Sequence, residues 1–393
     1  LYSSAASDVY KRQVGESTDN HVRRLLTHLN ILDKEHQLDI DIFDLYFHSR
    51  ETSFLCYKIY NTKHLFFRFL YKIKILRSLL NLLDVYISFL PILKHRYDLV
   101  NVHLWNRNSF FLYPFYRIIS PKLMISPWGS DVYRINAFDK LIAKLCYHKV
   151  DYISVAPIKF RDDIATLFNV PDGKFVNLGF GSDTIDAINA QKKLSKEEAK
   201  KKLGLEDSYI ITCGYNASIS QNHHKLLDAI EKIQSQLPEN LCLVFPFTYG
   251  GTELYKKEIK QRLETCGIHY IMYTNFLSLD KLVALRKSSD IFIHMQSSDA
   301  YSASVQEYLL CDTAVINATW LRYPTLEKYG KPYKQIDTFE QLPNSILEIL
   351  SGDFPVISSK LKLEIINNGW NEKAKYWMNF YIERCAQKSN DKF

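Results

Sequence analysis

In this chain of 393 residues, the two carboxylates of Asp299 and Glu307 are candidate functional groups because of their residue type and their spacing. They flank a turn that follows an apolar run ending at His294 and precedes a helical pattern starting near Ser302 or Ala303. The start of a helix has unpaired N–H groups and the positive end of the helix dipole, so it is a natural seat for a phosphate. We therefore expect Ser302 and Ala303 to bind an anionic group, with Glu307 in the first two turns of the same helix.

A second polar segment, Gly214 to Lys225, follows the apolar run Tyr209 to Cys213. Its possible hydrogen-bond donors to a diphosphate are Asn216, Gln221, His223 and Lys225. Lys225 alone among them brings a firm positive charge. The alternative is that His223 and His224 form a solvent-exposed helix start, and the sequence leaves both interpretations open.

The segment around the two acids resembles the family-four glycosyltransferases of the GT-B fold. Asp299 and Glu307 stand at the spacing of that family's E-x7-E motif, and the following residues 308–316 (YLLCDTAVI) match its E-A-L-x-x-G-x-P-V-I pattern. The resemblance implies that Asp299 contacts the transferred sugar, with a shorter reach than the family's glutamate, and that Glu307 hydrogen-bonds the nucleotide ribose. It also implies that Phe276 and Leu277 lie in a loop that reads the nucleobase through its backbone.

The diphosphate segment departs from the family pattern. The family carries an Arg and a Lys in a G-R-x4-K-G motif, whereas residues 214–225 contain no Arg. This variant, with residues 245–251 (FPFTYGG), resembles the subgroup that transfers 4-acetamido-fucose to a lipid-linked sugar. The resemblance then implies that the four donors named above hold the diphosphate.

Two N-terminal residues are assigned by the same resemblance. Residues 14–17 read as the end of a first strand, where Gly15 would let the backbone approach the diphosphate. His21 would begin the next helix on the acceptor side, or it is a capping residue.

Three further residues fall in loops that face the cleft and the acceptor in the family. They are His103, Trp128 and Asp131. The family often has His where Trp128 stands, so Asp131 is the better catalytic candidate. His103 is either a second catalytic residue or a structural histidine.

Short apolar runs alternate with helical patterns along the chain, which is typical of parallel sheets covered by helices. The predicted strands are Leu38 to Phe43, Leu99 to His103, Leu123 to Ser126, Tyr152 to Ala156, Tyr209 to Cys213, Leu241 to Phe245, Tyr270 to Tyr273, Ile291 to His294 and Ala314 to Asn317. Ser195 and Glu198 predict a capping box that opens the helix Lys196 to Leu203. The expected fold class is α/β: a GT-B fold with two Rossmann-like, doubly wound domains that face a cleft.

The expected domain limits follow from this pattern. An acceptor-side domain covers residues 14–180, a nucleotide-sugar-binding domain covers residues 181–360, and residues 361–393 form a C-terminal helix that packs back on the first domain, then a polar tail. The seam is expected at Gly179 to Asp183, where two glycines free the backbone. Ser3 to Gln13 (SSAASDVYKRQ) matches one reading frame of a transposase sequencing adapter, so residues 1–13 are expected to be an adapter scar before a truncated first strand.

Composition excludes several classes of protein. Seven cysteines with no C-x-x-C pair argue against a disulfide framework and against a zinc site. Asp39 and Asp41 resemble a metal-binding D-x-D, but the alternation around them predicts a strand with its acids turned outward. We therefore expect no metal and no cofactor. Leu79 to Leu93 is interrupted by polar residues and falls short of the ~20 residues that span a bilayer.

The whole chain has a net charge of +7. Within it, basic and aromatic residues alternate in residues 54–77. Such a stretch can lie on an anionic membrane surface. The alternative is a helix with a solvated basic face that packs on its own domain. No nucleic-acid-binding module is visible, so no nucleic-acid partner is expected.

The resemblance to family-four glycosyltransferases implies a retaining, metal-independent glycosyltransferase. It would move a sugar from a nucleotide-sugar donor to a glycan or lipid-linked saccharide acceptor in bacterial surface-polysaccharide (lipopolysaccharide or capsule) biosynthesis, as a peripheral protein at the cytoplasmic face of the plasma membrane. Two alternatives share the fold: a sugar-nucleotide epimerase or hydrolase, which needs no acceptor surface, and a non-catalytic partner subunit, which would explain the missing Arg.

Overall fold

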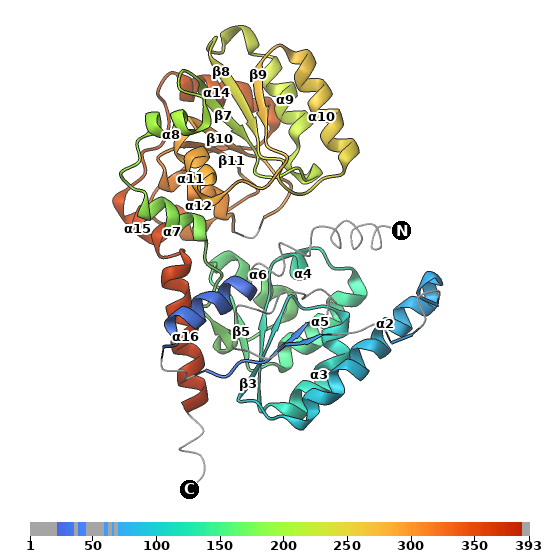
Figure 1. The fold of residues 1–393 in the computed structure, drawn as a ribbon. Helices are drawn as coiled ribbons and strands as arrows, with labels where there is room; N and C mark the ends of the chain where they lie inside the picture. Colours follow the sequence, from blue (N-terminus) through green and yellow to red (C-terminus); the bar gives the residue numbers. More distant parts are fainter. Residues whose placement is uncertain are drawn as a thin grey trace. The chain divides into compact units, whose positions relative to one another are not determined.

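The computed structural model describes residues 22–34, 38–44, 59–61, 65–66, 70–299 and 301–386. The chain divides into two compact units, which are described separately below. The C-terminal unit is built on the segment Gly181–Asn371. The N-terminal unit combines the described residues of Gly15–Phe180 with those of Glu372–Phe393 (Figure 1).

The N-terminal unit is centred on four parallel strands in the order β3-β4-β5-β6. They are β3 (Leu99–His103), β4 (Lys122–Ser126), β5 (Tyr152–Ser154) and β6 (Phe175–Val176). A second, two-stranded parallel sheet pairs β1 (Ile42–Asp44) with β2 (Ile59–Asn61). The helices are residues 22–32, α2 (Lys74–Phe89), α3 (Arg107–Ile119), α4 (Ser130–Tyr133), α5 (Ala137–Lys149), α6 (Ile158–Phe168) and most of α16 (Trp370–Ala386), with 3-10 turns η1 (Leu70–Lys72), η2 (Leu90–Lys94) and η3 (Asp172–Lys174).

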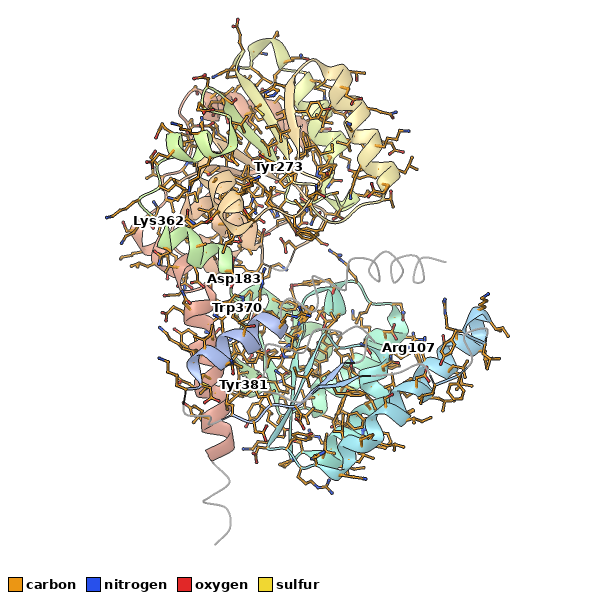
Figure 2. The ribbon with its side chains drawn as sticks, viewed as in Figure 1. Arg107, Asp183, Tyr273, Lys362, Trp370 and Tyr381 are labelled. Atoms are coloured by element: carbon orange, nitrogen blue, oxygen red, sulfur yellow. The ribbon has the colours of Figure 1, made fainter. Side chains whose placement is uncertain are left out.

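The last helix of the chain, α16, completes the N-terminal unit. The Trp377 indole N–H donates to the Gly179 carbonyl at 2.9 Å. Tyr381, which Figure 2 labels on the same helix, has a hydroxyl that accepts from the Asn101 amide of β3 at 3.1 Å. The Phe380 ring meets the Tyr152 ring of β5 edge-on, with 5.3 Å between the centroids. A core segment of this unit therefore comes from the far end of the sequence.

The C-terminal unit has one six-stranded, all-parallel sheet in the order β12-β11-β10-β7-β8-β9. Its strands are β7 (Tyr209–Cys213), β8 (Leu241–Phe245), β9 (His269–Met272), β10 (Ile291–His294), β11 (Ala314–Ala318) and β12 (Lys334–Ile336). Its helices are α7 (Asp183–Ala190), α8 (Lys196–Leu203), α9 (His223–Glu231), α10 (Glu253–Cys266), α11 (Leu279–Ser288), α12 (Ala303–Leu310), α13 (Pro324–Glu327), α14 (Leu342–Leu350) and α15 (Ser359–Ile366), with 3-10 turns η4 (Ile219–Gln221), η5 (Gln234–Gln236) and η6 (Phe339–Gln341). Every residue of β8, β10 and β11 is buried, as expected of strands covered on both faces.

The strand order makes β7 and β10 neighbours, although two strands lie between them in the sequence. The chain runs outward from β7 to β8 and β9, then returns across β7 to β10 and continues outward to β11 and β12. In open α/β sheets ligands bind at such a reversal, beyond the carboxyl ends of the strands. The loops after Cys213 and His294 therefore define the place to look for a site.

Most predicted elements are confirmed, and two corrections have clear causes. The capping box at Ser195 and Glu198 is present. The predicted strand Leu38 to Phe43 is wrong at its start, because the Asp33 carboxylate accepts from the Leu38 N–H at 3.0 Å and pairing with β2 begins only at Ile42.

The helix predicted over the C-terminal segment is interrupted between α15 and α16. There Asn367 and Asn368 form a turn and Gly369 forms an isolated bridge with Ser182, whose N–H donates to the Asn368 carbonyl at 3.0 Å.

The predicted length of the apolar stretch in α2 also needs correction. Within the described residues, the helix Leu76–Lys94 is long and apolar enough to cross a membrane by length and composition alone. One face of this helix packs on the N-terminal unit: Asp84 is fully buried and accepts from the Leu65 N–H at 3.0 Å, and Phe89 packs against Tyr116 of α3.

Candidate functional site

The carboxyl ends of β7 and β10 bring together two buried residues of the predicted diphosphate segment. Gln221 and His223 are almost completely buried, and within the described part of the chain one polar atom of each, Gln221 Oε1 and His223 Nε2, has no hydrogen-bond partner. Both atoms lie over Gly214, where a side chain would displace them, since a Cβ there would be 2.8 Å from Gln221 Oε1 and 3.2 Å from His223 Nε2. Buried polar atoms without partners are uncommon in folded proteins, so they mark this point of the sheet.

The alternative of a solvent-exposed start for His223 is wrong. His223 packs among the rings of Phe245, Phe247 and Tyr255, and its Nδ1 lies 3.1 Å from the Tyr255 hydroxyl. Burial lowers the pKa of His223 to about 3, so the ring is neutral at physiological pH. His224, its neighbour, is exposed.

Asn216 is also buried, whereas Lys225 is exposed. The Asn216 carboxamide oxygen accepts from the Ser218 N–H at 2.8 Å, which shapes the loop after β7. Lys225 is exposed, with its ammonium 5.1 Å from the centre of the Phe339 ring. Of the four predicted diphosphate donors, Lys225 is therefore the exposed charge, whereas Asn216, Gln221 and His223 are buried.

Glu307 lies in α12 and is held in a buried ion pair that the sequence did not reveal. Arg286 of α11 donates from Nε to Glu307 Oε2 at 2.9 Å, and both side chains are about 95% buried, at 5% and 6% exposure. The Ser182 hydroxyl donates to the other carboxylate oxygen at 2.9 Å. Arg286 also donates to the Tyr308 hydroxyl at 2.7 Å. Attraction to Glu307 and these hydrogen bonds outweigh burial and raise the pKa of Arg286 above its ordinary value, so it stays charged.

Asp299 lies in the loop between β10 and α12, beside two aromatic residues. Its Oδ2 accepts from the Tyr323 hydroxyl at 3.3 Å and lies 3.6 Å from Nε2 of His294. The Asp299 side chain keeps 16% of its surface exposed, whereas His294 has none. The two predicted acids therefore differ in solvent exposure. Glu307 is buried and accepts one hydrogen bond at each carboxylate oxygen, whereas Asp299 is partly exposed to solvent.

The predicted anion-binding helix start is confirmed as an element. Helix α12 begins at Ala303, and Ser302 caps it by accepting from the Val305 N–H at 3.2 Å. Ser302 is buried and Ala303 is exposed. The Ser302 side chain occupies one of the free N–H groups of the first turn, so others remain for a ligand.

The predicted nucleobase loop exposes an aromatic ring. The Phe276 ring is largely exposed and stacks on the Tyr249 ring, with centroids 6.1 Å apart and planes 5° apart. Leu277 packs beside the small core cluster of Ile210 and Val244. The stack joins the loop after β9 to the loop after β8.

In the N-terminal unit, His103 and Trp128 lie in an aromatic cluster after β3 and β4. The His103 ring is 6.5 Å from Trp128, 5.9 Å from Phe180 and 6.1 Å from Trp377, between centroids. Its Nε2 lies 3.1 Å from the Asn101 amide, whose oxygen accepts from the Ser126 hydroxyl at 2.7 Å. These contacts suit a structural histidine, and a catalytic role for His103 stays a prediction.

Asp131 is buried at the start of α4, and its carboxylate organises the loop that carries Trp128. It accepts from the backbone N–H groups of Trp105 at 2.9 Å, Trp128 at 2.8 Å and Gly129 at 3.0 Å. Burial raises the pKa of Asp131 to about 6, although these N–H groups pull it down. A catalytic role for Asp131 stays a prediction, and its visible contacts are those of a loop anchor.

Some predicted features lie outside the described residues. They are Gly15, His21, residues 1–13 and, in the basic aromatic stretch, residues 54–58, 62–64 and 67–69. Among the residues that the structure does describe, no three His, Cys, Asp or Glu side chains gather as a metal site. Asp41, of the possible D-x-D, accepts from the Tyr97 hydroxyl at 2.7 Å.

Sequence reasoning missed the partners that complete the C-terminal site: Arg286, His294, Asn317 and Tyr323. A signal existed for two of them. His294 and Asn317 are polar residues at or near the carboxyl ends of otherwise apolar strands, which is where α/β proteins place functional groups.

A comparison with protein families matches this same region of the chain. Residues 195–322, which contain β7, β10, α12 and both acids, match the family model described as glycosyl transferases group 1. Residues 195–322 form a glycosyl transferases group 1 domain. An uncharacterised glycosyltransferase of Methanocaldococcus jannaschii is 25% identical over 181 residues, which is 46% of this chain and 43% of that protein. The match thus spans less than half the length of this curated relative.

Solved structures extend the likeness in fold beyond the group 1 domain. A sucrose-phosphate synthase from Thermosynechococcus elongatus has a TM-score of 0.67 at 13% identity and covers 95% of this chain and 94% of its own. A glycosyltransferase from Rickettsia africae has a TM-score of 0.65 at 14% identity, and the match covers 93% of this chain and 94% of the other. The Anabaena protein HepE, solved with UDP and glucose, has a TM-score of 0.53 at 14% identity, with coverage of 86% of both chains. The architecture is the α/β GT-B fold.

Proposed function

We propose that this protein is a retaining glycosyltransferase that moves a sugar from a nucleotide-sugar donor to a lipid-linked or polysaccharide acceptor. The observation that carries the proposal is the group 1 domain, in which Asp299 and Glu307 flank the start of α12 beside the strand-order reversal. The acceptor class, the place in surface-polysaccharide assembly and the likeness to 4-acetamido-fucose transferases rest on the sequence resemblance.

The donor is proposed to bind at the carboxyl ends of β7 and β10. Glu307 would accept from the ribose hydroxyls, since each of its oxygens has one donor so far and a carboxylate oxygen can accept two. The diphosphate would lie between the first turn of α12 and Lys225. The solved complexes of HepE with UDP and with UDP-glucose support a nucleotide-sugar as the ligand class.

Negative charge grows on the leaving diphosphate as the bond to the sugar stretches. The N–H groups at the start of α12 and the Lys225 ammonium are held in place before the reaction, so they can stabilise this charge without reorganising. Retention is proposed to follow from attack on the same face that the leaving group departs from, with the leaving phosphate accepting the proton. The proposal therefore assigns no nucleophile to the protein, and no metal or cofactor.

The acceptor is proposed to meet the loop held by Asp131. The three N–H groups that donate to Asp131 fix the backbone at Trp128 and Gly129, so the half-buried Trp128 would supply the contact surface. His103 would orient Trp128 through the aromatic cluster.

The N-terminal unit is further proposed to dock on an anionic membrane surface. Helix α2 and η2 expose one apolar stripe, Leu79, Leu83, Ile87 and Leu90, spaced three or four residues apart. Exposed Lys72, Lys94 and Arg96 flank its ends, and Asp84, the acid in this helix, is buried. An apolar stripe between cations suits an anionic headgroup layer, which supports a peripheral position at the cytoplasmic face.

The donor assignment is tested by isothermal titration of the protein with UDP, GDP, dTDP and CMP. We expect one nucleotide to bind. Glu307→Gln should then weaken binding about tenfold or more, because the lost charge removes a strong acceptor from the ribose. Asp299→Asn should leave nucleotide binding unchanged and lower the turnover of the corresponding nucleotide-sugar.

Asp312→Asn is the matched control for this experiment. Asp312 is an exposed acid at the far end of α12, in a left-handed conformation that Asn tolerates, so its affinity should equal that of the wild type. Failure of all four nucleotides to bind a folded protein would overturn the proposal and favour a non-catalytic partner subunit. Equal affinity of the wild type and Glu307→Gln would remove the ribose assignment.

Membrane docking is tested by co-sedimentation with vesicles of phosphatidylglycerol and of phosphatidylcholine. Binding to the anionic vesicles, lost in Leu83→Glu/Ile87→Glu but kept in Leu254→Glu, is expected; Leu254 is an exposed residue of α10 in the other unit. Protein that resists a carbonate wash would instead indicate a membrane-spanning helix. Equal binding of all variants would reject the α2 surface.

A further inference from the structure

His294 is fully buried at the carboxyl end of β10, and its Nε2 has no hydrogen-bond partner among the residues that the structure describes. The nearest acidic atom is Oδ2 of Asp299, 3.6 Å away and beyond hydrogen-bond distance. A buried polar atom that faces a partly exposed carboxylate without bonding to it calls for an explanation, because such atoms cost free energy.

The proton on the other nitrogen of the ring is fixed by the neighbouring strand. Asn317 of β11 donates from Nδ2 to the Leu321 carbonyl at 2.7 Å, so its Oδ1 is left to accept. His294 Nδ1 lies 2.8 Å from that oxygen and therefore carries a hydrogen. A neutral His294 would then present a lone pair from Nε2 to the carboxylate of Asp299, which is repulsive.

Among the described residues, two tyrosines are the other titratable groups with a ring contact to His294. The Tyr215 ring stacks on the imidazole with 6.0 Å between the centroids, and the Tyr323 ring lies 6.3 Å away. Burial raises the pKa of both hydroxyls well above the ordinary value, so both remain neutral. The Tyr323 hydroxyl donates to the same Oδ2 of Asp299 that His294 faces. A proton between His294 and Asp299 would relieve the repulsion.

We propose that His294 is a positioning residue, whose imidazolium, protonated at Nε2, holds the Asp299 carboxylate in place for the transferred sugar. Asn317 and Tyr323 complete the arrangement: Asn317 orients the ring from behind, and Tyr323 takes the second lone pair of Oδ2. Oδ1 of Asp299 is then left for a sugar hydroxyl. This inference rests on the proposed function and names the residue that would prepare its sugar-binding acid.

The first test detects the proton without using activity. In long-range 1H–15N spectra of the 15N-histidine-labelled protein at pH 7, the His294 ring is identified by its loss in His294→Gln. We expect a doubly protonated imidazolium in the wild type and a neutral ring with its hydrogen on Nδ1 in Asp299→Asn. A neutral ring in the wild type would overturn the proposal.

The second test separates positioning from a purely structural role through kinetics. Hydrolysis of UDP-glucose is followed from pH 5 to 10 in the wild type and in His294→Gln, with His269→Gln, an exposed histidine of β9, as control. We expect the wild-type kcat to fall at alkaline pH as the proton leaves. His294→Gln should have a kcat lower by about ten- to hundredfold, as for the loss of a hydrogen bond to a charged group, with an unchanged KM. Its profile should lack the alkaline fall, because a glutamine amide does not titrate.

Parallel pH profiles for all three proteins, or a raised KM with an unchanged kcat, would overturn the inference. If UDP-glucose is neither bound nor hydrolysed, the other nucleotide-sugars of the panel replace it. If none of them is a substrate, the proposed function fails, whereas the protonation state of His294 in the spectra still decides whether the pair exists.

Discussion

At the scale of single residues, the ion pair between Arg286 and Glu307 is the contact on which the group 1 domain most depends. Both side chains are almost completely buried, so each charge relies on the other. A buried ion pair adds little net stability compared with an apolar pair, but the loss of one partner leaves the other charge stranded. The pair therefore matters more for geometry than for stability, because it sets the direction of the Glu307 carboxylate.

Replacement of Arg286 should cost far more than replacement of both partners. We expect Arg286→Met to lower the free energy of unfolding by about 3–5 kcal/mol, and Arg286→Met/Glu307→Gln to recover part of that loss. Urea unfolding of the four proteins of the cycle measures both effects. Lys260→Met, in an exposed pair with Glu264, serves as control and should have little effect. Additive losses in the double variant would mean that the two residues do not depend on each other.

Asp131 gives a pH dependence whose sign follows from its burial. Its pKa is raised from 3.8 to about 6, chiefly by burial, so the folded protein holds this proton more tightly than the unfolded chain. The stability that this proton provides is present at low pH and is lost as the pH rises from about 4 to about 6. The slope from this one group should approach roughly 1.4 kcal/mol per pH unit.

Asp131→Asn should remove that slope and also weaken the fold by about 1–3 kcal/mol, because its NH2 group would face a backbone N–H that now has no acceptor. Urea midpoints between pH 4 and 7 give both quantities. Asp139→Asn, at an exposed pair with Arg107, should keep the wild-type slope. If the free energy of unfolding of Asp131→Asn depends on pH as steeply as that of the wild type, groups other than Asp131 cause the slope.

At the scale of elements, the loops after β7 and β8 are joined at a point that only glycine permits. The Ala217 N–H donates to the Tyr249 carbonyl at 2.7 Å, and Gly251 lies against the Ala217 carbonyl with a φ of +66°. A Cβ at Gly251 would collide with that carbonyl oxygen. The loop that holds Asn216 is therefore shaped by the next loop along the sheet.

Gly251→Ala and Gly267→Ala form a matched pair of substitutions. Both glycines have a positive φ, but a Cβ at Gly267 meets nothing closer than 3.6 Å. Gly267→Ala should cost about 1–2 kcal/mol from its left-handed backbone alone. Gly251→Ala should cost more and should also weaken nucleotide binding, as thermal unfolding and titration would reveal. An equal loss of stability in the two variants would mean that the Ala217 carbonyl can move to accommodate the new Cβ at little cost.

At the scale of the whole molecule, the two units differ in how the chain builds them. The C-terminal unit is one continuous segment with its own six-stranded sheet and one large core. The N-terminal unit needs α16, which the chain supplies last. We therefore expect the C-terminal unit to fold without the rest of the chain, and the N-terminal unit to need the C-terminal segment for its stability.

A fragment of residues 181–371 should fold alone. We expect it to unfold cooperatively in urea and to bind the same nucleotide as the full chain, since both predicted donor contacts, Glu307 and Lys225, are inside it. A fragment of residues 22–180 should be much less stable, because it lacks Trp377 and Phe380. Circular dichroism and titration of the two fragments measure these outcomes. A disordered 181–371 fragment would show that the second unit depends on the first.

The sequence by itself determined the elements and the order of the acids. Runs such as Tyr209–Cys213 and Ile291–His294 match the observed strands residue for residue, because a strand buried on both faces is apolar along most of its length. The start of α12 at Ser302 and Ala303 was equally predictable, since capping is a local interaction. Because Asp299 precedes this start and Glu307 follows it, the sequence also placed the two acids on either side of the start of α12.

The tertiary structure alone decided which groups surround those acids. Arg286 reaches Glu307 from another helix, and Asn317 reaches His294 from the next strand of the sheet. His223, whose sequence allowed an exposed position, is enclosed by the rings of Phe245, Phe247 and Tyr255. Such contacts depend on strand order and helix packing, which bring together residues that are distant in the sequence. No local pattern of residue types carries that information, and so the site's partners appear only once the sheet is assembled.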